Sequence, residues 1–119
     1  MADSPRTPLE LAKLFQEVAE EKQAWKPVRL SLRGKTSVAD YFVICEGETD
    51  RQVRAIADGL LERARGFGIR PLAVAGYEDA TWVLLDFDSV IVHVFLPGER
   101  AFYDLEELWS AAARQRPAS

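Results

Sequence analysis

Cysteine and histidine are scarce in this sequence, which has one of each in 119 residues. Cys45 cannot form a disulfide within the chain, and it lies in an apolar run, as expected for a small buried side chain in a reducing compartment. His93 has no second histidine or cysteine close to it in the sequence, which argues against a zinc site. No Gly-x-Ser-x-Gly motif supplies a nucleophile that His93 could activate. We therefore expect a structural histidine whose polar ring edge needs a hydrogen-bond partner, either internal or on another chain.

Positive charge and long apolar runs are also lacking. Lysine and arginine number 15 against 19 aspartates and glutamates, and the pI is about 5.0. This charge disfavours direct binding to a phosphate backbone and permits a basic protein partner. No stretch approaches the roughly 20 apolar residues of a membrane span, and the first residues lack the pattern of a signal peptide. We expect a soluble, cytoplasmic protein with no membrane partner and no nucleic-acid specificity.

The chain is long enough for one hydrophobic core and too short for two ordinary domains, since 48% of its 119 residues are hydrophobic. We expect a single domain over residues 1–119. Its core should span about 7–113, with flexible tails at 1–6 and 114–119.

Capping boxes and hydrophobic periodicity predict an α/β fold. Helix starts are predicted at Thr7-Pro8-Leu9-Glu10 and Thr49-Asp50-Arg51-Gln52. Strands are predicted at 28–32, 41–45, 70–75 and on both sides of a short link at 86–89, and a last helix should carry Leu105, Leu108, Trp109 and Ala112. The order α-β-β-α-β-β-β-α implies a mixed five-stranded sheet packed with helices, in which the strands at 41–45 and 70–75 are joined by a crossover and run parallel.

The segment from Thr81 to Phe95 is the most informative in the chain. It predicts a hairpin of two apolar strands, and it carries both a tryptophan and the only histidine. Strands that are apolar on both faces need cover on both sides. Either the chain's own helices supply that cover or part of one face is a docking surface for another molecule.

Two motifs suggest chemistry, and each has a plainer explanation. Gly34-Lys35-Thr36-Ser37 resembles part of a phosphate-binding loop, but Arg29 stands where the motif requires its first glycine, so a solvated turn is favoured. Asp86 and Asp88 could bind a divalent metal if a third carboxylate, such as Asp40, converged on them. Aspartates at a hairpin link are also favoured for local turn hydrogen bonds. We expect no metal site, no cofactor and no catalytic residue.

Arginines and aromatic residues offer a different signal. Arg51, Arg54, Arg63 and Arg65 are interleaved with acids along the second helix, which is typical of a solvated face of mixed charge. Several aromatic residues lie at strand starts, in loops or at helix flanks, where they could anchor a protein interface or lie at the core edge. They are Tyr77, Trp82, Phe102, Tyr103 and Trp109. Among them, Trp82 is the expected interface residue.

Five ordered segments resemble the ribosomal silencing factor family, also called Iojap-like. They are A-D-Y-F-V-I-C-E-G at 39–47, D-R-Q-V-R-A-I-A-D at 50–58, W-V-L-L-D at 82–86, V-I-V-H-V-F at 90–95 and F-Y-D-L-E-E-L-W at 102–109. The resemblance covers roughly residues 9–112. Glu46 and Glu48 stand where the family more often has small polar residues, so the start of the second helix is more acidic here.

The resemblance implies a nucleotidyltransferase-like fold without its catalytic carboxylate set. It implies binding to ribosomal protein number fourteen of the large ribosomal subunit, on the face where the small subunit docks. Occupying that face would block subunit joining and lower translation when nutrients are scarce. It also implies a homodimer when the protein is not bound to the ribosome.

We hypothesise that this partner binds a contact surface on the hairpin. Trp82, Val83 and Leu84 would form its apolar centre, and Tyr77, Glu78, Asp86 and His93 would complete it, with the acids facing basic groups. Further interface or dimer contacts are expected at Phe95, Tyr103 and Trp109. Two rival hypotheses are an enzyme that uses Asp40, Asp86 and Asp88 with magnesium, and a purely structural homodimer built on the hairpin.

Overall fold

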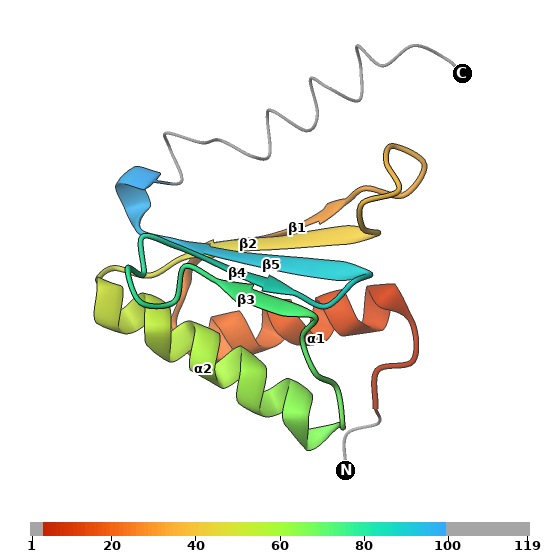
Figure 1. Ribbon diagram of the computed structural model, residues 1–119, viewed down its shortest axis with the longest axis horizontal. Coiled ribbons are helices and arrows are strands. Elements are labelled where there is room, and N and C mark those ends of the chain that lie inside the picture. Colours follow the sequence, from red (N-terminus) through yellow and green to blue (C-terminus); the bar gives the residue numbers. More distant parts are fainter. Residues whose placement is uncertain (1–3, 100–119) are drawn as a thin grey trace.

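The computed structural model describes residues 4–99, which form a five-stranded sheet with two helices packed on one of its faces (Figure 1). The elements in chain order are α1 (Pro8–Glu21), β1 (Trp25–Ser31), β2 (Tyr41–Glu46), α2 (Asp50–Gly66), β3 (Ala73–Ala75), β4 (Trp82–Asp86) and β5 (Val90–Phe95). The predicted last helix, with Leu105, Leu108, Trp109 and Ala112, lies outside the described residues. So do the predicted contact residues Tyr103 and Trp109.

The start of α1 follows the predicted capping box in one of its two hydrogen bonds. The Thr7 hydroxyl accepts a hydrogen bond from the Glu10 backbone N–H at 3.1 Å, which satisfies one unpaired donor of the first turn. The Glu10 carboxylate accepts from the backbone N–H of Arg6 at 2.7 Å, one residue before the position that a capping box requires. The predicted helix start is confirmed.

The start of α2 is also confirmed, and its cap connects the two helices. The Thr49 hydroxyl accepts from the Gln52 backbone N–H at 3.1 Å. The Gln52 side chain does not turn back to Thr49 as predicted, because its amide donates to the carbonyl of Lys22 just after α1. This hydrogen bond joins the end of α1 to the first turn of α2.

The strand order is β1-β2-β5-β4-β3, in which β2 and β5 are parallel and the other neighbours are antiparallel. The predicted mixed five-stranded sheet is therefore confirmed. Strands β2 and β3 run in the same direction, as the predicted crossover requires, but β5 and β4 lie between them. The physical reason is burial: every residue of β5 is buried, which favours the sheet centre, whereas β3 is a short, exposed edge strand.

Two strands differ from their predicted bounds. Strand β3 begins at Ala73 rather than at Arg70, and Leu72 just before it is 70% exposed. Strand β1 begins at Trp25, before the predicted start at Val28, and its pairing with β2 is irregular between these two residues. Pro27 lies in this irregular part, and it is tolerated there because β1 is an edge strand.

Alternation along the strands divides the buried side chains into two layers. The first layer lies between the sheet and the two helices and includes Phe15, Ile56, Val43, Val83 and Val92. The second lies on the opposite face of the sheet, which neither α1 nor α2 covers (Figure 1). Its buried apolar members are Leu32, Ala39, Phe42, Ile44, Ile91 and Phe95, with Val28, Leu30, Trp82 and Leu84 half-buried around them. With reference to residues 4–99 alone, we call this side the helix-free face.

Candidate functional site

The predicted hairpin is formed by β4 and β5, and its link is three residues long. Asp86 is the last residue of β4, so only residues 87–89 connect the strands. Phe87 is buried, and its ring lies 4.6 Å from the ring of Phe15 on α1, so the link is partly a core element. One Asp86 carboxylate oxygen accepts from the Asp88 backbone N–H at 2.8 Å. Asp86 thus makes the local turn hydrogen bond that its sequence position favours.

Trp82 and Leu84 lie together on the helix-free face with two residues of β5. Trp82 pairs with Phe95 and Leu84 pairs with His93 across the ladder, and paired residues point to the same face. The Trp82 and Phe95 rings stack with centroids 5.1 Å apart. The Trp82 indole N–H donates to Nδ1 of His93 at 3.0 Å. We call these four side chains the Trp82 cluster. Phe95 and His93 are buried, so only Trp82 and Leu84 contribute exposed surface to it.

Val83 is the predicted contact residue that the structure does not bring to this cluster. It is fully buried on the opposite face of the sheet, among side chains of the helix-facing layer. The reason is the two-residue period of a strand, which sends the side chains of Trp82 and Val83 to opposite faces. Placing Val83 in the apolar centre was therefore wrong for this conformation.

His93 is almost completely buried, with 4% of its surface exposed. Its Nδ1 accepts from Trp82, so in the neutral ring Nε2 must carry the proton. Nε2 has no hydrogen-bond partner within residues 4–99. Burial lowers the pKa of His93 from 6.5 to about 4, because the charged imidazolium loses its hydration. The structure thus gives this ring one internal partner and leaves its second nitrogen as a buried donor.

The loop between β3 and β4 places Tyr77 and Glu78 just before the Trp82 cluster. Tyr77 is half-buried, and its hydroxyl donates to the Asp58 carboxylate on α2 at 2.8 Å. This hydrogen bond, followed by desolvation and by the charge of Asp58, raises the pKa of Tyr77 above its usual 10.0. Glu78 is exposed. The loop is therefore fastened to α2 through Tyr77 while Glu78 remains at the surface.

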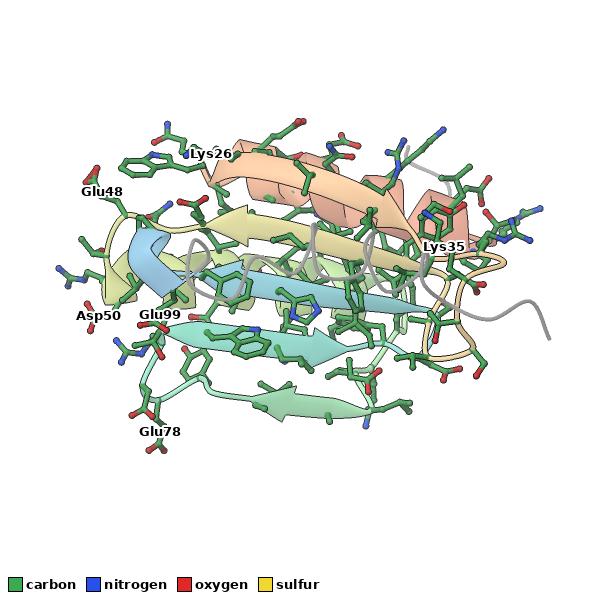
Figure 2. The ribbon with its side chains drawn as sticks, turned by 90° about the horizontal axis from the view of Figure 1, so that it is seen from above. Lys26, Lys35, Glu48, Asp50, Glu78 and Glu99 are labelled. Carbon is green, nitrogen blue, oxygen red and sulfur yellow. The ribbon has the colours of Figure 1, made fainter. Side chains whose placement is uncertain are left out.

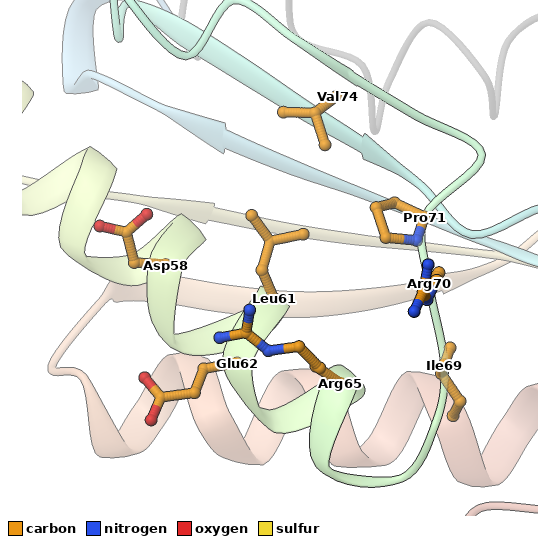
Figure 3. Close-up of a pocket in the computed structure, with 8 residues that line it drawn as sticks. All are labelled: Asp58, Leu61, Glu62, Arg65, Ile69, Arg70, Pro71 and Val74. Carbon is orange, nitrogen blue, oxygen red and sulfur yellow. The ribbon is translucent and has the colours of Figure 1, made fainter.

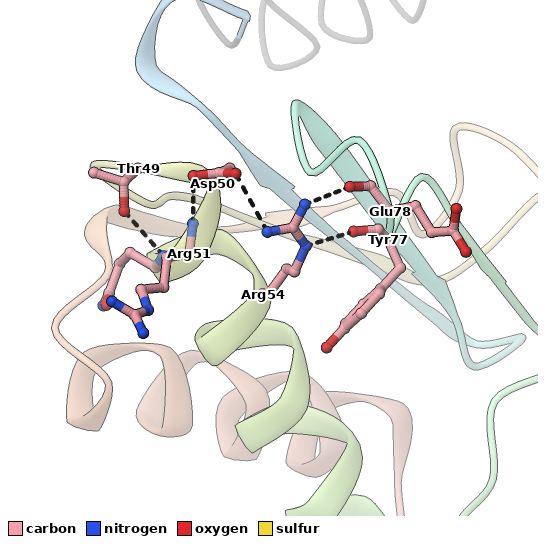
Figure 4. Close-up of polar contacts among 7 residues, drawn as sticks. Thr49, Asp50, Arg51, Arg54, Tyr77 and Glu78 are labelled. Carbon is pink, nitrogen blue, oxygen red and sulfur yellow. Dashed lines mark hydrogen bonds and ion pairs between the residues drawn. The ribbon is translucent and has the colours of Figure 1, made fainter.

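The side chain of Arg54 holds the same loop by hydrogen bonds to the main chain of the loop (Figure 4). The guanidinium donates to the carbonyl oxygen of Tyr77 at 3.2 Å and to the carbonyl oxygen of Glu78, and it forms an ion pair with Asp50 at 3.3 Å. The sequence reading placed Arg54 on a solvated face and missed these contacts. No local signal could have revealed them, because both carbonyls lie more than 20 residues away in the sequence.

Acidic side chains gather at one end of the sheet. Figure 2 shows Glu48, Asp50, Glu78 and Glu99 at this end. Lys26 also lies there, whereas Lys35 lies at the opposite end. Asp86 is separated from Trp82 by the length of β4, on the order of 13 Å at the usual rise per strand residue. The structure therefore places Glu78 near the start of the Trp82 strand and places Asp86 at the other end of that strand.

The other predicted candidates for chemistry have structural explanations within the described residues. Gly34 has a left-handed backbone with φ 79°, and the backbone N–H groups of Lys35 and Thr36 both donate to the carbonyl of Leu32. The segment leads into β2 rather than into a helix, as expected for a turn. No group of three potential ligands from His, Cys, Asp and Glu in residues 4–99 could hold a metal ion. Neither α1 nor α2 is long and apolar enough to cross a membrane.

Figure 3 shows a surface pocket of about 490 Å³, and no side chain of the Trp82 cluster lines it. It is formed by the second half of α2 and the segment that leads into β3. Its lining residues are Asp58, Leu61, Glu62, Arg65, Ile69, Arg70, Pro71 and Val74. Acidic and basic side chains are balanced in this lining, and none of the predicted contact residues belongs to it.

Comparison with known proteins adds a family relationship to this geometry. A family model described as ribosomal silencing factor during starvation matches residues 5–119. The chain is 44% identical to the ribosomal silencing factor RsfS of Halalkalibacterium halodurans, over 87% of this chain and 88% of that protein. It is 40% identical to the RsfS of Bacillus subtilis, over 86% of each chain. A crystal structure of a Chromobacterium violaceum protein superposes with a TM-score of 0.86 at 31% identity, covering 95% of this chain and 92% of that one.

Proposed function

Because the chain belongs to the ribosomal silencing factor family, we propose that it represses translation by binding the large ribosomal subunit where the small subunit docks. The proposed contact is with ribosomal protein number fourteen of the large subunit, in the cytoplasm, chiefly under nutrient limitation. The observation that carries this proposal is the Trp82 cluster, where a half-buried tryptophan and Leu84 lie on the sheet face that neither α1 nor α2 covers. A large aromatic side chain at such a place is a typical interface anchor.

Electrostatics supports a basic partner. The chain carries a formal net charge of −4, and Glu78 lies in the loop that leads directly into Trp82. Glu48 and Glu99 share that end of the sheet with Glu78 in Figure 2, and so do Lys26 and Asp50, which pairs with Arg54. Complementary charge around an apolar centre raises the rate of encounter and selects the partner. A basic ribosomal protein would supply the positive charge that complements these acids.

The proposed mechanism is competition between two ligands for one surface. If the silencing factor and the small subunit exclude each other, the silenced fraction depends on the free factor concentration relative to its dissociation constant. No covalent step and no cofactor are required.

Co-sedimentation with purified ribosomal particles tests the proposal. The full chain should sediment with isolated large subunits and be absent from assembled ribosomes, since the small subunit covers the proposed site in the assembled particle. Equal recovery with isolated and assembled particles would contradict the proposed location. No recovery with isolated large subunits would contradict the function itself.

A homodimer through the same face is a second proposed state of the unbound chain. The half-buried apolar side chains of the helix-free face, Val28, Leu30, Trp82 and Leu84, would pack against a second copy in place of the ribosome. If the two surfaces overlap, dimerisation competes with ribosome binding, so dilution should increase the fraction of chains that bind large subunits.

Glu78→Lys should weaken binding to large subunits mainly by slowing association. Glu78 is exposed, so the charge reversal should leave the fold intact and reverse the attraction to a basic surface. We expect an association rate constant lower by roughly tenfold at low salt, with the difference from the wild type shrinking as salt is added. Stopped-flow association at several ionic strengths measures this.

Lys35→Glu is the control for this prediction. Lys35 is exposed at the opposite end of the sheet (Figure 2), and its substitution also changes the net charge by two units, in the other direction. It should change the association rate far less than Glu78→Lys does. Equal and opposite effects of the two substitutions would mean that only net charge matters and would contradict a local role of Glu78.

A further inference from the structure

Arg54 holds the main chain of one particular loop. Its guanidinium reaches from the first turns of α2 to two successive carbonyl oxygens, those of Tyr77 and Glu78. The ion pair with Asp50 on the same helix fixes the guanidinium from the other side at 3.3 Å. A planar guanidinium can make these contacts together because its donors point in fixed directions. An ammonium group could not reproduce this geometry.

The loop that Arg54 holds, between β3 and β4, lies very close to the main chain of Trp82 at Gly76. Gly76 has a left-handed backbone with φ 76°, and a Cβ atom there would lie 2.1 Å from the carbonyl oxygen of Trp82. Ala80 is buried and donates its backbone N–H to the carbonyl of Gly76 at 2.9 Å, which closes the loop on itself. The loop and the first residue of β4 therefore form one unit, and the position of the loop relative to Trp82 is constrained.

Arg54 determines which part of Glu78 faces outward. Its contact is with the carbonyl oxygen of Glu78, and Figure 4 shows the Glu78 side chain directed away from the guanidinium. In the described part of the chain, no cation forms an ion pair with the Glu78 carboxylate. The Arg54 guanidinium thus binds the main chain of Glu78 and not its carboxylate, which remains available to a group outside the chain.

We propose that Arg54 is a positioning residue for partner recognition, which fixes the loop so that the Glu78 carboxylate is presented beside Trp82 to a cationic group of the partner. The inference rests on the proposed function and deepens it, since it assigns the orientation of the acidic contact to a residue of α2. Arg54 acts through Glu78 and makes no contact with the partner in this account. Its positive charge is compensated by Asp50, so repulsion from a basic partner stays small.

A double-mutant cycle between Arg54 and Glu78 tests the inference. The full-length chain carrying Arg54→Gln should bind isolated large subunits on the order of tenfold more weakly, because the loop loses both carbonyl contacts. In a Glu78→Gln background, the same Arg54→Gln change should cost less than about threefold, because no carboxylate remains to be positioned. Affinity is measured by titration, and a thermal melt is recorded for each variant.

Arg63→Gln is the matched control on the same helix. Arg63 forms an ion pair with Glu21 on α1 at 2.6 Å and contacts no carbonyl of the loop. It should leave binding unchanged in both backgrounds. Arg54→Lys should bind with intermediate affinity, since it keeps the charge but not the paired donors. If Arg54→Gln does not fold, the affinity of Arg54→Lys tests whether Arg54 positions Glu78.

Three results would overturn the inference. The first is wild-type affinity for Arg54→Gln or, where that variant does not fold, for Arg54→Lys. The second is an equal loss of affinity in the two Glu78 backgrounds, which would indicate an independent contact. The third is a similar loss for Arg63→Gln. These results leave the proposed function standing, whereas a wild-type chain that fails to bind large subunits would remove both proposals.

Discussion

Trp82→Ala should weaken binding to isolated large subunits by roughly thirtyfold or more, which corresponds to about 2 to 4 kcal/mol of binding free energy. Trp82 is half-buried on the helix-free face, and its ring stacks on Phe95 at 5.1 Å, so it is held rigidly while part of it remains at the surface. A rigid aromatic side chain buries a large area in an interface and loses little conformational freedom. Titration of the variant against large subunits measures the loss.

The stability of Trp82→Ala must be measured beside its affinity. The variant removes the Phe95 stacking and the hydrogen bond to His93, so a decrease in the free energy of unfolding is expected. That decrease should be smaller than the loss of binding free energy, because the side chain is only half-buried. Equal loss of folding and binding would show that Trp82 is a core residue and not an interface anchor.

Val83→Ala is the matched control for this prediction. Val83 is the next residue of the same strand, but it is fully buried in the helix-facing layer. Its truncation should lower the free energy of unfolding by about 1 to 3 kcal/mol. The affinity of the folded variant for large subunits should not change. A thirtyfold loss of affinity for Val83→Ala would contradict the division of the two faces that the strand alternation provides.

Acidification from pH 7.5 to pH 5 should cost the wild-type fold about 2 kcal/mol through His93 alone. The pKa of this ring is about 4 in the folded protein and 6.5 when the chain is unfolded. Below pH 6.5 the unfolded chain binds a proton that the folded chain does not, so stability falls as the pH falls. The loss approaches about 3 kcal/mol and levels off below pH 4, where the folded ring is also protonated.

His93→Gln separates this effect from the titration of the carboxylates. A glutamine stays neutral at every pH, and its carbonyl oxygen can accept the Trp82 indole hydrogen bond in place of Nδ1. Urea unfolding at pH 7.5 and pH 5 should show a change in stability that is smaller in the variant by about 2 kcal/mol. An identical change in both proteins would contradict a buried neutral histidine at this position.

Features that depend on neighbouring residues were predictable from the sequence. The two helix starts, the hairpin and the short link all follow from residues close together in the chain. The side-chain hydroxyls of Thr7 and Thr49 both cap their helices as predicted. The bond between Asp86 and Asp88 is equally local. In each case the sequence contains both partners of the interaction within a few residues.

Features that depend on distant residues were not predictable. Strand β5 lies between β2 and β4 because it is buried throughout, and no local pattern ranks the strands within a sheet. Arg54 was missed because its partners are main-chain carbonyls, which every residue has. Val83 was misplaced for a different reason. It was predicted to share one surface with its sequence neighbours Trp82 and Leu84, although successive side chains of a strand point to opposite faces.

The joining of purified ribosomal subunits, followed by light scattering, tests the central claim most directly. Increasing concentrations of the chain, added to large subunits before small subunits, should reduce joining along a saturable curve to near zero. Trp82→Ala should shift that curve to concentrations roughly thirtyfold higher. Full joining of the subunits at a saturating excess of the wild-type chain would contradict the account.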